Sequence, residues 1–265
     1  AKIEEFVNCK CPKCGKDAKR ETDTMPNWAG SSWYFLRFMD ARNDKCFADM
    51  KAMKYWKRVD FYDGGNEHIA RHLLYARFWV QFLYNIGLVP HKEMIWTRVS
   101  HGMVLGPDNQ KMSKSKGNVI NPDDIVNEYG ADTLRVYEMF MGDYTQDAPW
   151  NTDSLKGCKR FIDRIVRLQD KVTNEETYTP SLEILIHKSI KKVSDDIENM
   201  AYNTAISTLM ILLNTYEKET SITKKDYQVL LTLLNPFAPH ITEELNEKLG
   251  CNPICDSVWP SYDEA

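Results

Sequence analysis

The second half of the chain has a helical pattern, in which apolar residues recur every three or four positions. This spacing places apolar side chains on one face of a helix. It predicts four helices, at about residues 153–172, 181–200, 203–219 and 223–249. Pro236 and Pro239 are expected to kink the last of them. Helices of this length predict an all-α bundle, which we assign to residues 146–265 because a turn-rich segment precedes it.

The first half has a different pattern, in which short apolar runs alternate with a helix. A strand-like run at 59–63 ends at a pair of glycines, a helix follows at about 67–86, and a further strand covers roughly 95–105. This order predicts a βαβ unit with parallel strands, whose ligand site lies at the carboxyl ends of the strands. Two short helices are expected next, at 122–129 and 131–141. The predicted fold class is therefore α/β, followed by the bundle.

The composition is that of a globular protein without a membrane segment. Of the 265 residues, 43% are hydrophobic and 27% are charged, and the longest apolar runs are too short to cross a bilayer. Seven mostly scattered cysteines argue against a disulfide framework, and no signal peptide is recognised, so we expect a cytoplasmic protein. Because the net charge is −4, contacts with nucleic acid must depend on local basic patches.

The most distinctive polar segment is Lys-Met-Ser-Lys-Ser at residues 111–115, followed by Lys116 and Gly117. It lies between an apolar run at 101–105 and a helix start at Asn121. Ammonium groups neutralise phosphate oxygens, and hydroxyls and glycine amides donate hydrogen bonds to them, so the loop suits a polyphosphate. The alternative, for an arbitrary segment of lysines and serines, is a solvated loop without a ligand.

Small residues at 29–32 lie among aromatic residues at 28 and 33–35. Small residues let a ligand approach the backbone, and aromatic side chains supply an apolar wall with a few hydroxyls nearby. The segment therefore suits one side of an apolar ligand pocket. A loop leading into an ordinary aromatic core helix would show the same pattern, and the pattern alone does not separate the two.

The stretch from Gly64 to His68 stands at the carboxyl end of the first predicted strand. Glycines let a flat nucleoside approach the backbone, and Glu67 can accept hydrogen bonds from ribose hydroxyls, although a plain tight turn would look alike. His68 and His72 are four residues apart and share a helix face. Three alternatives remain open: the two histidines line a ligand site, they belong to the core, or they bind a metal together with Glu67. The zinc-protease spacing His-Glu-x-x-His is not matched, and no third ligand is evident.

Cys11 and Cys14 form a Cys-Pro-x-Cys-Gly knuckle, a turn that directs two thiolates toward one zinc ion. A tetrahedral site needs four ligands, and only Cys9 lies close by, while nothing in the sequence places Cys46. We assign residues 1–20 to a zinc-ribbon-like remnant. Cys11 and Cys14 are candidate zinc ligands, and the alternative is a pair that has lost its partners.

A basic stripe runs along the first helix of the bundle. Its members are spaced four, four and three residues apart: Lys156, Arg160, Arg164 and Arg167. One explanation is contact with RNA phosphates. The other is a solvated helix face whose cations pair with nearby acidic residues such as Asp163.

Four motifs occur in one order along the chain: the segments 25–34 and 64–72, the lysine loop at 111–115, and the segment 234–245. The loop matches the signature of class I aminoacyl-tRNA synthetases letter for letter. The first motif, preceded by Glu-Thr-Asp-Thr, and the pairing of Gly-Gly-x-Glu-His with His-Leu-Leu-Tyr separate leucyl from isoleucyl and valyl relatives. The whole chain therefore resembles the leucyl-tRNA synthetase family.

The resemblance implies an ATP-dependent ligase that activates leucine as leucyl-adenylate and transfers it to tRNA(Leu), with Mg²⁺ accompanying ATP. It implies catalytic roles for Lys111 and Lys114, of which Lys114 is the stronger candidate for the leaving phosphates. Further ATP contacts are implied for Gly64, Gly65, Glu67, His101, Gly102, Met103, Val104, Met112, Ser113 and Ser115. The leucine pocket is implied at Trp28, Ser31, Tyr34, His68 and His72, with Trp28 standing where many relatives carry Phe.

Parts of the family pattern are missing from this chain. It has no His-Ile-Gly-His-type motif, no editing domain and no leucine-specific insertion before the lysine loop. We therefore interpret 21–145 as the second half of a class I catalytic domain with a partial Rossmann-like sheet, and 146–265 as an anticodon-binding-type domain. The expected partners are tRNA(Leu), leucine, ATP, and the missing N-terminal half and editing domain, without which we expect no activity.

Two other functions are consistent with parts of the sequence. A non-catalytic tRNA-binding subunit with a vestigial nucleotide site would bind tRNA even after charge reversal of the lysine loop. A metallohydrolase built on Glu67, His68 and His72 would carry a stoichiometric metal ion at that helix.

Overall fold

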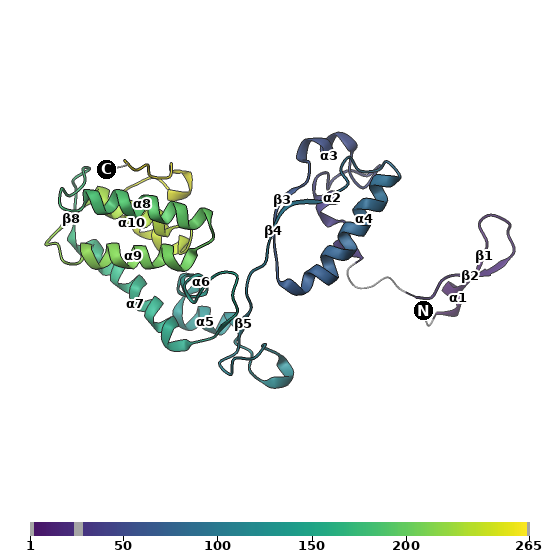
Figure 1. Ribbon diagram of the computed structural model, residues 1–265, viewed down its shortest axis with the longest axis horizontal. Helices are drawn as coiled ribbons and strands as arrows, with labels where there is room; N and C mark the ends of the chain where they lie inside the picture. Colours follow the sequence, from purple (N-terminus) through teal and green to yellow (C-terminus); the bar gives the residue numbers. More distant parts are fainter. Residues whose placement is uncertain (1–2, 24–28, 264–265) are drawn as a thin grey trace. The chain divides into compact units, whose positions relative to one another are not determined.

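The computed structural model describes residues 3–23 and 29–263, which form two compact units, Ala1–Ser100 and His101–Ala265 (Figure 1). Each unit has its own buried core. No helix in the described ranges is long and apolar enough to cross a membrane. Trp28, assigned by resemblance to the leucine pocket, lies outside the described residues. The domain boundary expected between residues 145 and 146 stays a prediction.

The first unit contains the expected βαβ arrangement. It begins with helix α1 (Glu4–Val7) and the antiparallel hairpin of β1 (Asn8–Lys10) and β2 (Asp17–Lys19). It continues with α2 (Tyr34–Phe38), α3 (Met50–Trp56), β3 (Val59–Asp63), α4 (Leu74–Asn85) and β4 (Ile95–Val99). Strands β3 and β4 are parallel, with Tyr62 opposite Arg98, so the predicted βαβ unit is confirmed.

Helix α4 holds this unit together through one face only. Ala76, Val80 and Leu83 are buried in the core, whereas Phe78 on the other side is 71% exposed. Outside the core, the Arg77 guanidinium binds both oxygens of Glu93, with nitrogen–oxygen distances of 2.8 and 2.7 Å. That pair connects the helix to the segment that leads into β4.

The helix predicted from residue 67 to 86 is wrong in its first third. A 3-10 turn (Asn66–His68) and a π-helical turn (Ile69–Leu73) precede α4. A π turn contains one residue more than an α turn, so it rotates the side chains that follow. His72 lies within this turn and is buried. The change of helical register therefore bears directly on the predicted site.

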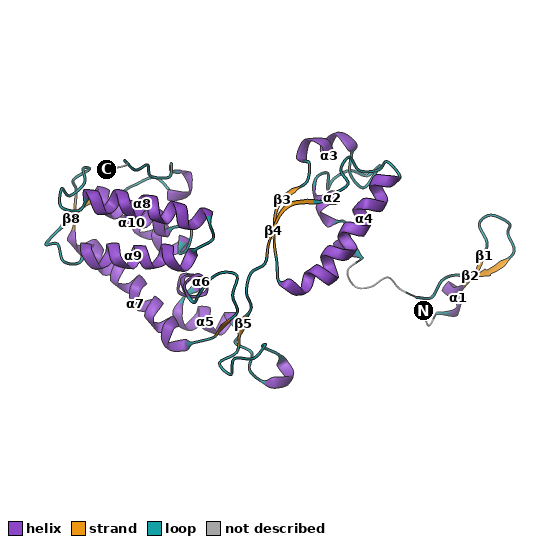
Figure 2. Ribbon diagram, viewed as in Figure 1, coloured by secondary structure: helices purple, strands orange, loops and turns teal. Residues whose placement is uncertain are grey.

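The regular elements of the second unit are mainly helices, joined by loops (Figure 2). Its helices are α5 (Pro122–Tyr129), α6 (Ala131–Phe140), α7 (Thr152–Leu168), α8 (Glu183–Glu198), α9 (Tyr202–Tyr216), α10 (Lys224–Leu234) and α11 (Pro239–Lys248). Two pairs of very short parallel strands connect distant segments: β5 (Val104–Leu105) with β6 (Ala148–Pro149), and β7 (Val172–Thr173) with β8 (Ile222–Thr223). The α/β fold class followed by a helical bundle is confirmed.

Two predicted elements are each divided in the structure. The strand expected over 95–105 is two strands, β4 and β5, because the Gly102 amide donates to the Tyr144 carbonyl at 2.8 Å instead of continuing the first sheet. The helix expected over 223–249 is not kinked but divided, into α10 and α11. Pro236 and Pro239 both lack the backbone donor that a continuous helix would need.

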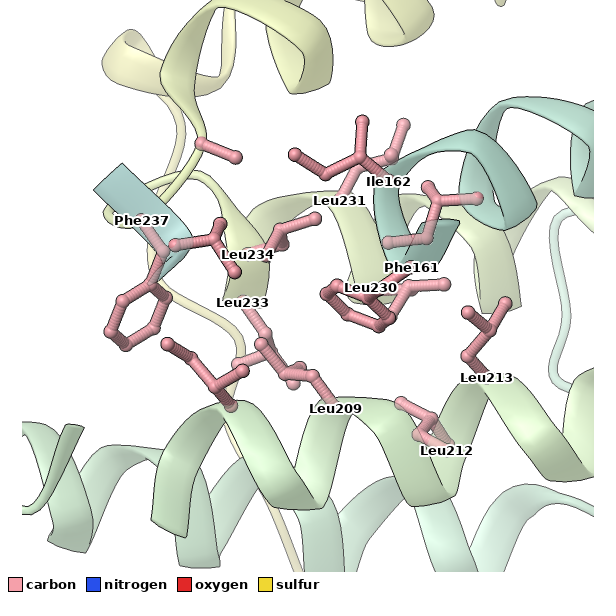
Figure 3. Close-up of a cluster of buried hydrophobic side chains, with 14 of the residues drawn as sticks. Phe161, Ile162, Leu209, Leu212, Leu213, Leu230, Leu231, Leu233, Leu234 and Phe237 are labelled. Atoms are coloured by element: carbon pink, nitrogen blue, oxygen red, sulfur yellow. The ribbon is translucent and has the colours of Figure 1, made fainter. Parts of the chain in front are cut away.

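The core of the second unit joins its helices into one body (Figure 3). Figure 3 shows side chains from α7, α9 and α10 meeting in one apolar cluster, which includes Phe161, Ile162, Leu209, Leu212, Leu213, Leu230, Leu231, Leu233, Leu234 and Phe237. Burying each leucine contributes about 1.5–3 kcal/mol. Met112, Ile120 and Ile125 pack partly buried against the same core. The lysine loop is therefore anchored at both ends to the helical unit.

Helix α6 also holds the first turn of α11. The Asp132 carboxylate accepts hydrogen bonds from the Ile241 amide at 2.6 Å and from the His240 ring at 2.7 Å. Arg135 donates to the carbonyl oxygens of Pro236 at 2.9 Å and Phe237 at 3.2 Å. We call these contacts the α6–α11 latch. They connect the second helix after the lysine loop to the last helix of the bundle.

Candidate functional site

The carboxyl ends of β3 and β4 lie together, as a parallel pair requires. The Gly64 amide donates to the Val99 carbonyl at 3.2 Å, and the Ser100 hydroxyl donates to the Asn66 side chain at 2.6 Å. A Cβ atom on Gly65 would lie 2.4 Å from a carboxylate oxygen of Glu67, so a larger residue there would displace the Glu67 side chain. The Gly64–His68 stretch therefore occupies the edge at which open parallel sheets bind ligands.

Three of the predicted leucine-pocket residues meet around His72. Its Nε2 atom lies 2.7 Å from the Ser31 carbonyl oxygen, and its Nδ1 atom lies 2.8 Å from the Tyr62 hydroxyl. The rings of Tyr34 and His72 are nearly parallel, with centroids 6.0 Å apart. The His68 ring meets His72 edge-on at 6.3 Å. Ser31, Tyr34, His68 and His72 therefore form one cluster within the first unit.

Tyr62 belongs to this cluster, although the sequence analysis did not select it. It lies on β3, two residues before the glycine pair, and both its hydroxyl and its ring contact His72. Tyr62 lies two residues before the predicted ligand-binding edge, and that position is a sequence signal for a role in the binding site. The contact with residue 72 itself depends on the π turn, which the sequence pattern does not reveal.

The lysine loop is held closed by the Asn118 side chain. Its oxygen accepts from the Ser113 amide at 2.9 Å, and its nitrogen lies 3.1 Å from both carboxylate oxygens of Asp108. The hydrogen bond from Asn118 lowers the pKa of Asp108, so that carboxylate stays charged and keeps its partner. The loop is thus a closed structure and not an unrestrained chain.

Within the loop, the three lysines differ in what they bind. Residues Lys114–Lys116 form a 3-10 turn that ends at Gly117, whose φ of +66° favours glycine. Lys116 donates to the Gln110 side chain at 2.7 Å. Lys111 and Lys114 are exposed, and their ammonium groups have no hydrogen-bond or ion-pair partner among the described residues. Two cations therefore remain available to an anionic ligand.

The segment before the loop borders a hollow of about 260 Å³. His101, Gly102, Met103 and Val104 all contribute to its wall, together with residues from α6 and the following turn. The Met103 amide is occupied by the Asp147 carboxylate at 2.7 Å, and a Cβ atom on Gly102 would lie 1.9 Å from the Gln146 carbonyl oxygen. The segment is therefore fixed tightly against residues 144–148.

The two groups of predicted ATP contacts lie in different units. Gly64, Gly65 and Glu67 belong to the first, whereas residues 101–104 and the lysine loop belong to the second. The contact of each group with ATP stays a prediction from the resemblance.

The cysteine knuckle brings two thiols together but not a complete metal site. Gly15 adopts φ +72° and its amide donates to the Cys11 carbonyl at 2.9 Å, which closes the turn around Cys11 and Cys14. Across residues 3–23 and 29–263, no three His, Cys, Asp or Glu side chains are grouped so as to hold a metal ion. A tetrahedral zinc site needs four ligands, so the residues present do not fit bound zinc. The same finding leaves the Glu67, His68 and His72 group without a further metal ligand.

The knuckle nevertheless predicts a difference in cysteine reactivity. Hydrogen bonds from the Cys14 and Lys13 backbone lower the pKa of Cys11, whereas burial raises the pKa of Cys158 to about 11. Because thiolates are the reactive form, iodoacetamide at pH 7 should alkylate Cys11 well before Cys158. Mass spectrometry of peptides sampled over time measures the two rates. Equal alkylation rates of Cys11 and Cys158 in the folded chain would contradict the predicted difference in reactivity.

The basic stripe on α7 is only partly available to a ligand. Arg164 is committed within the protein, because its Nε donates to Glu217 at 2.9 Å and its Nη2 contacts the same carboxylate and Asn214. Lys156 lies 3.7 Å from the exposed Asp153. Arg160 and Arg167 are the members that we keep as candidates for RNA phosphates, together with Lys156, whose exposed ion pair is weak.

Known proteins match the chain from end to end. Residues 3–151 match the family described as tRNA synthetases class I (I, L, M and V), and residues 181–265 match the anticodon-binding domain of tRNA ligase. A leucine–tRNA ligase of Alkaliphilus oremlandii is 54% identical over 266 residues, which cover 100% of this chain and 33% of the relative.

A solved structure has a similar fold. The crystal structure of the ternary complex of Agrobacterium radiobacter K84 agnB2 LeuRS, tRNA and LeuAMS has a TM-score of 0.87 and 32% identity, over 98% of this chain and 36% of that chain. This chain therefore spans about a third of the length of the relatives that it matches.

Proposed function

We propose that this chain, which belongs to the class I tRNA synthetases (I, L, M and V), is part of a leucine–tRNA ligase. The observation that carries the proposal is the lysine loop, in which Lys111 and Lys114 expose cations that pair with no described residue, while Asn118 maintains the shape of the loop. Enzymes of this family use ATP with Mg²⁺ as a substrate. The two free cations suit its phosphates.

The proposed chemistry has two steps. A leucine carboxylate oxygen attacks the α-phosphorus of ATP, and the bond to the bridging oxygen of pyrophosphate breaks, which leaves leucyl-adenylate. Negative charge develops on the departing pyrophosphate, and Lys111 and Lys114 stabilise it there. A hydroxyl of the tRNA 3′-terminal ribose then attacks the leucyl carbonyl, and AMP leaves. Positioning of the reactants supplies much of the remaining acceleration.

The other proposed contacts are those with ATP and with the leucine side chain. Gly64, Gly65 and Glu67 are the proposed ATP contacts of the first unit, and His101, Gly102, Met103 and Val104 are proposed ATP contacts of the second. The Ser31, Tyr34, His68 and His72 cluster would border the leucine side chain, since it combines aromatic surface with few available polar atoms. Met112, Ser113 and Ser115 are the remaining proposed ATP contacts in the lysine loop.

We also propose that the bundle binds tRNA(Leu). The match to an anticodon-binding domain supports this, and Lys156, Arg160 and Arg167 are the proposed phosphate contacts on α7. The remaining synthetase segments, including a His-Ile-Gly-His-type half and an editing domain, are proposed partners, and the cytoplasm is the proposed location.

A chimeric enzyme tests the proposal. This chain replaces the matching third of the Alkaliphilus oremlandii ligase, and exchange of pyrophosphate into ATP is measured with leucine, isoleucine or valine. We expect exchange that depends on leucine, and no exchange from the 265-residue chain by itself. If the chimera folded and bound tRNA(Leu) without any exchange, the chain would instead be a non-catalytic tRNA-binding subunit.

A further inference from the structure

His72 has hydrogen-bond partners on both ring nitrogens, and this determines where its proton lies. Ser31 offers a backbone carbonyl, which only accepts, so Nε2 at 2.7 Å carries the hydrogen. A neutral ring then has an acceptor at Nδ1, and the Tyr62 hydroxyl at 2.8 Å donates to it. His72 is only 6% exposed, so solvent does not replace these partners.

The three residues connect three separate elements. Tyr62 lies on β3, His72 in the π-helical turn, and Ser31 in the 3-10 turn at Gly30–Ser32 that precedes α2. The His72 ring lies nearly parallel to Tyr62 and to Tyr34, with interplanar angles of 27° and 26°. These contacts fix the wall of the proposed leucine pocket, because His72 connects β3 to the 3-10 turn that contains Ser31.

We infer that Tyr62 is a positioning residue for leucine binding, which acts by fixing His72 as its Nε2–H tautomer and thereby holding the Ser31 backbone. This inference rests on the proposed function. His72 then gives the amino acid no hydrogen bond, because both of its nitrogens are used within the protein. Selection in this part of the pocket depends on the shape of an apolar side chain.

Burial supports the donor role of Tyr62. Desolvation raises its pKa, so the phenol keeps its proton at neutral pH and continues to donate. In a Tyr62→Phe variant the ring surface remains and the donor is lost. A buried Nδ1 without a partner is unfavourable, and His72 is then free to change tautomer and release Ser31.

The first measurement uses the chimeric enzyme. Tyr62→Phe should raise the leucine KM about tenfold, which corresponds to the loss of one hydrogen bond at about 1.4 kcal/mol, with little change in kcat or in the ATP KM. The matched control is Tyr55→Phe, on α3, where the side chain is 76% exposed. A general loss of stability would lower the active fraction, and therefore kcat, without changing the leucine KM selectively. A leucine KM within twofold of the unsubstituted chimera would overturn the inference.

The second measurement needs no activity. Nitrogen-15 NMR of the histidine side chains in the 265-residue chain should show His72 as the Nε2–H tautomer, and Tyr62→Phe should shift its Nδ1 signal. An Nδ1–H tautomer in the unsubstituted chain, or an Nδ1 signal insensitive to Tyr62→Phe, would overturn the inference even if that variant were unstable. If the unsubstituted chimera shows no leucine-dependent exchange, the proposed function is contradicted instead. The tautomer of His72 then still tests whether Tyr62 donates to His72 and His72 to Ser31.

Discussion

Replacing Lys114 with alanine should lower leucine-dependent pyrophosphate exchange by a factor of about 100 to 1000 in the chimeric enzyme, the usual cost of losing one group that stabilises developing charge. Lys114 lies in the 3-10 turn and is exposed, and no other described residue pairs with its ammonium group. Its charge is therefore available only to a ligand. The effect should appear in kcat, because pyrophosphate gains charge as the bond breaks.

Lys116→Ala is the matched control for that experiment. The residue is in the same turn and carries the same charge, but its ammonium group donates to Gln110. Its removal should reduce exchange by a few-fold at most. If Lys114→Ala and Lys116→Ala lowered the rate equally, general loop charge would explain the result, and the specific role of Lys114 would be wrong.

Replacing Asp132 with alanine should destabilise the second unit by about 2–3 kcal/mol, since it removes a helix cap and leaves the partly buried Ile241 amide without its partner. Helix α11 has Ala238 at its N-cap position, with no side-chain cap of its own. Asp132, only 7% exposed, supplies that cap from α6 through the amides of Ile241 and His240. The mutation therefore acts on two helices at once.

Urea denaturation of the 265-residue chain measures this loss, and hydrogen exchange of peptides from α6 and α11 locates it. The control is Glu244→Ala on α11, which removes an exposed ion pair to Lys248 and should cost about 0.3–0.5 kcal/mol. Faster exchange throughout the bundle, with no preference for the first turn of α11, would contradict the latch.

The sequence predicted those features that depend on neighbouring residues. The parallel βαβ unit and most of the helices follow from local periodicity, and the Asn121 cap at the start of α5 follows from its position before Pro122. The family resemblance, which rests on contiguous motifs such as the lysine loop, is confirmed by the matches over the whole chain.

The features that the sequence did not predict depend on contacts between distant residues or on backbone irregularity. Arg164 reads as an available cation, yet it binds Glu217, 53 residues later. The sequence pattern of residues 67–86 is that of an ordinary helix, so nothing local reveals the π turn or the contact between His72 and Tyr62. Pro236 and Pro239 indicate a break, but its extent depends on Asp132 and Arg135, more than a hundred residues earlier.

The α6–α11 latch has a consequence for related sequences. Apart from the His240 ring, every group that Asp132 and Arg135 bind belongs to the main chain. Exposed positions that take part only through the main chain, such as Pro236, can therefore change their side chains while the hydrogen bonds remain. A change of Asp132 or Arg135 removes those hydrogen bonds. Pairwise covariation between the two helices should accordingly be weak, even though they are in contact. A method that infers proximity from correlated substitutions would miss one of the firmest contacts in the unit.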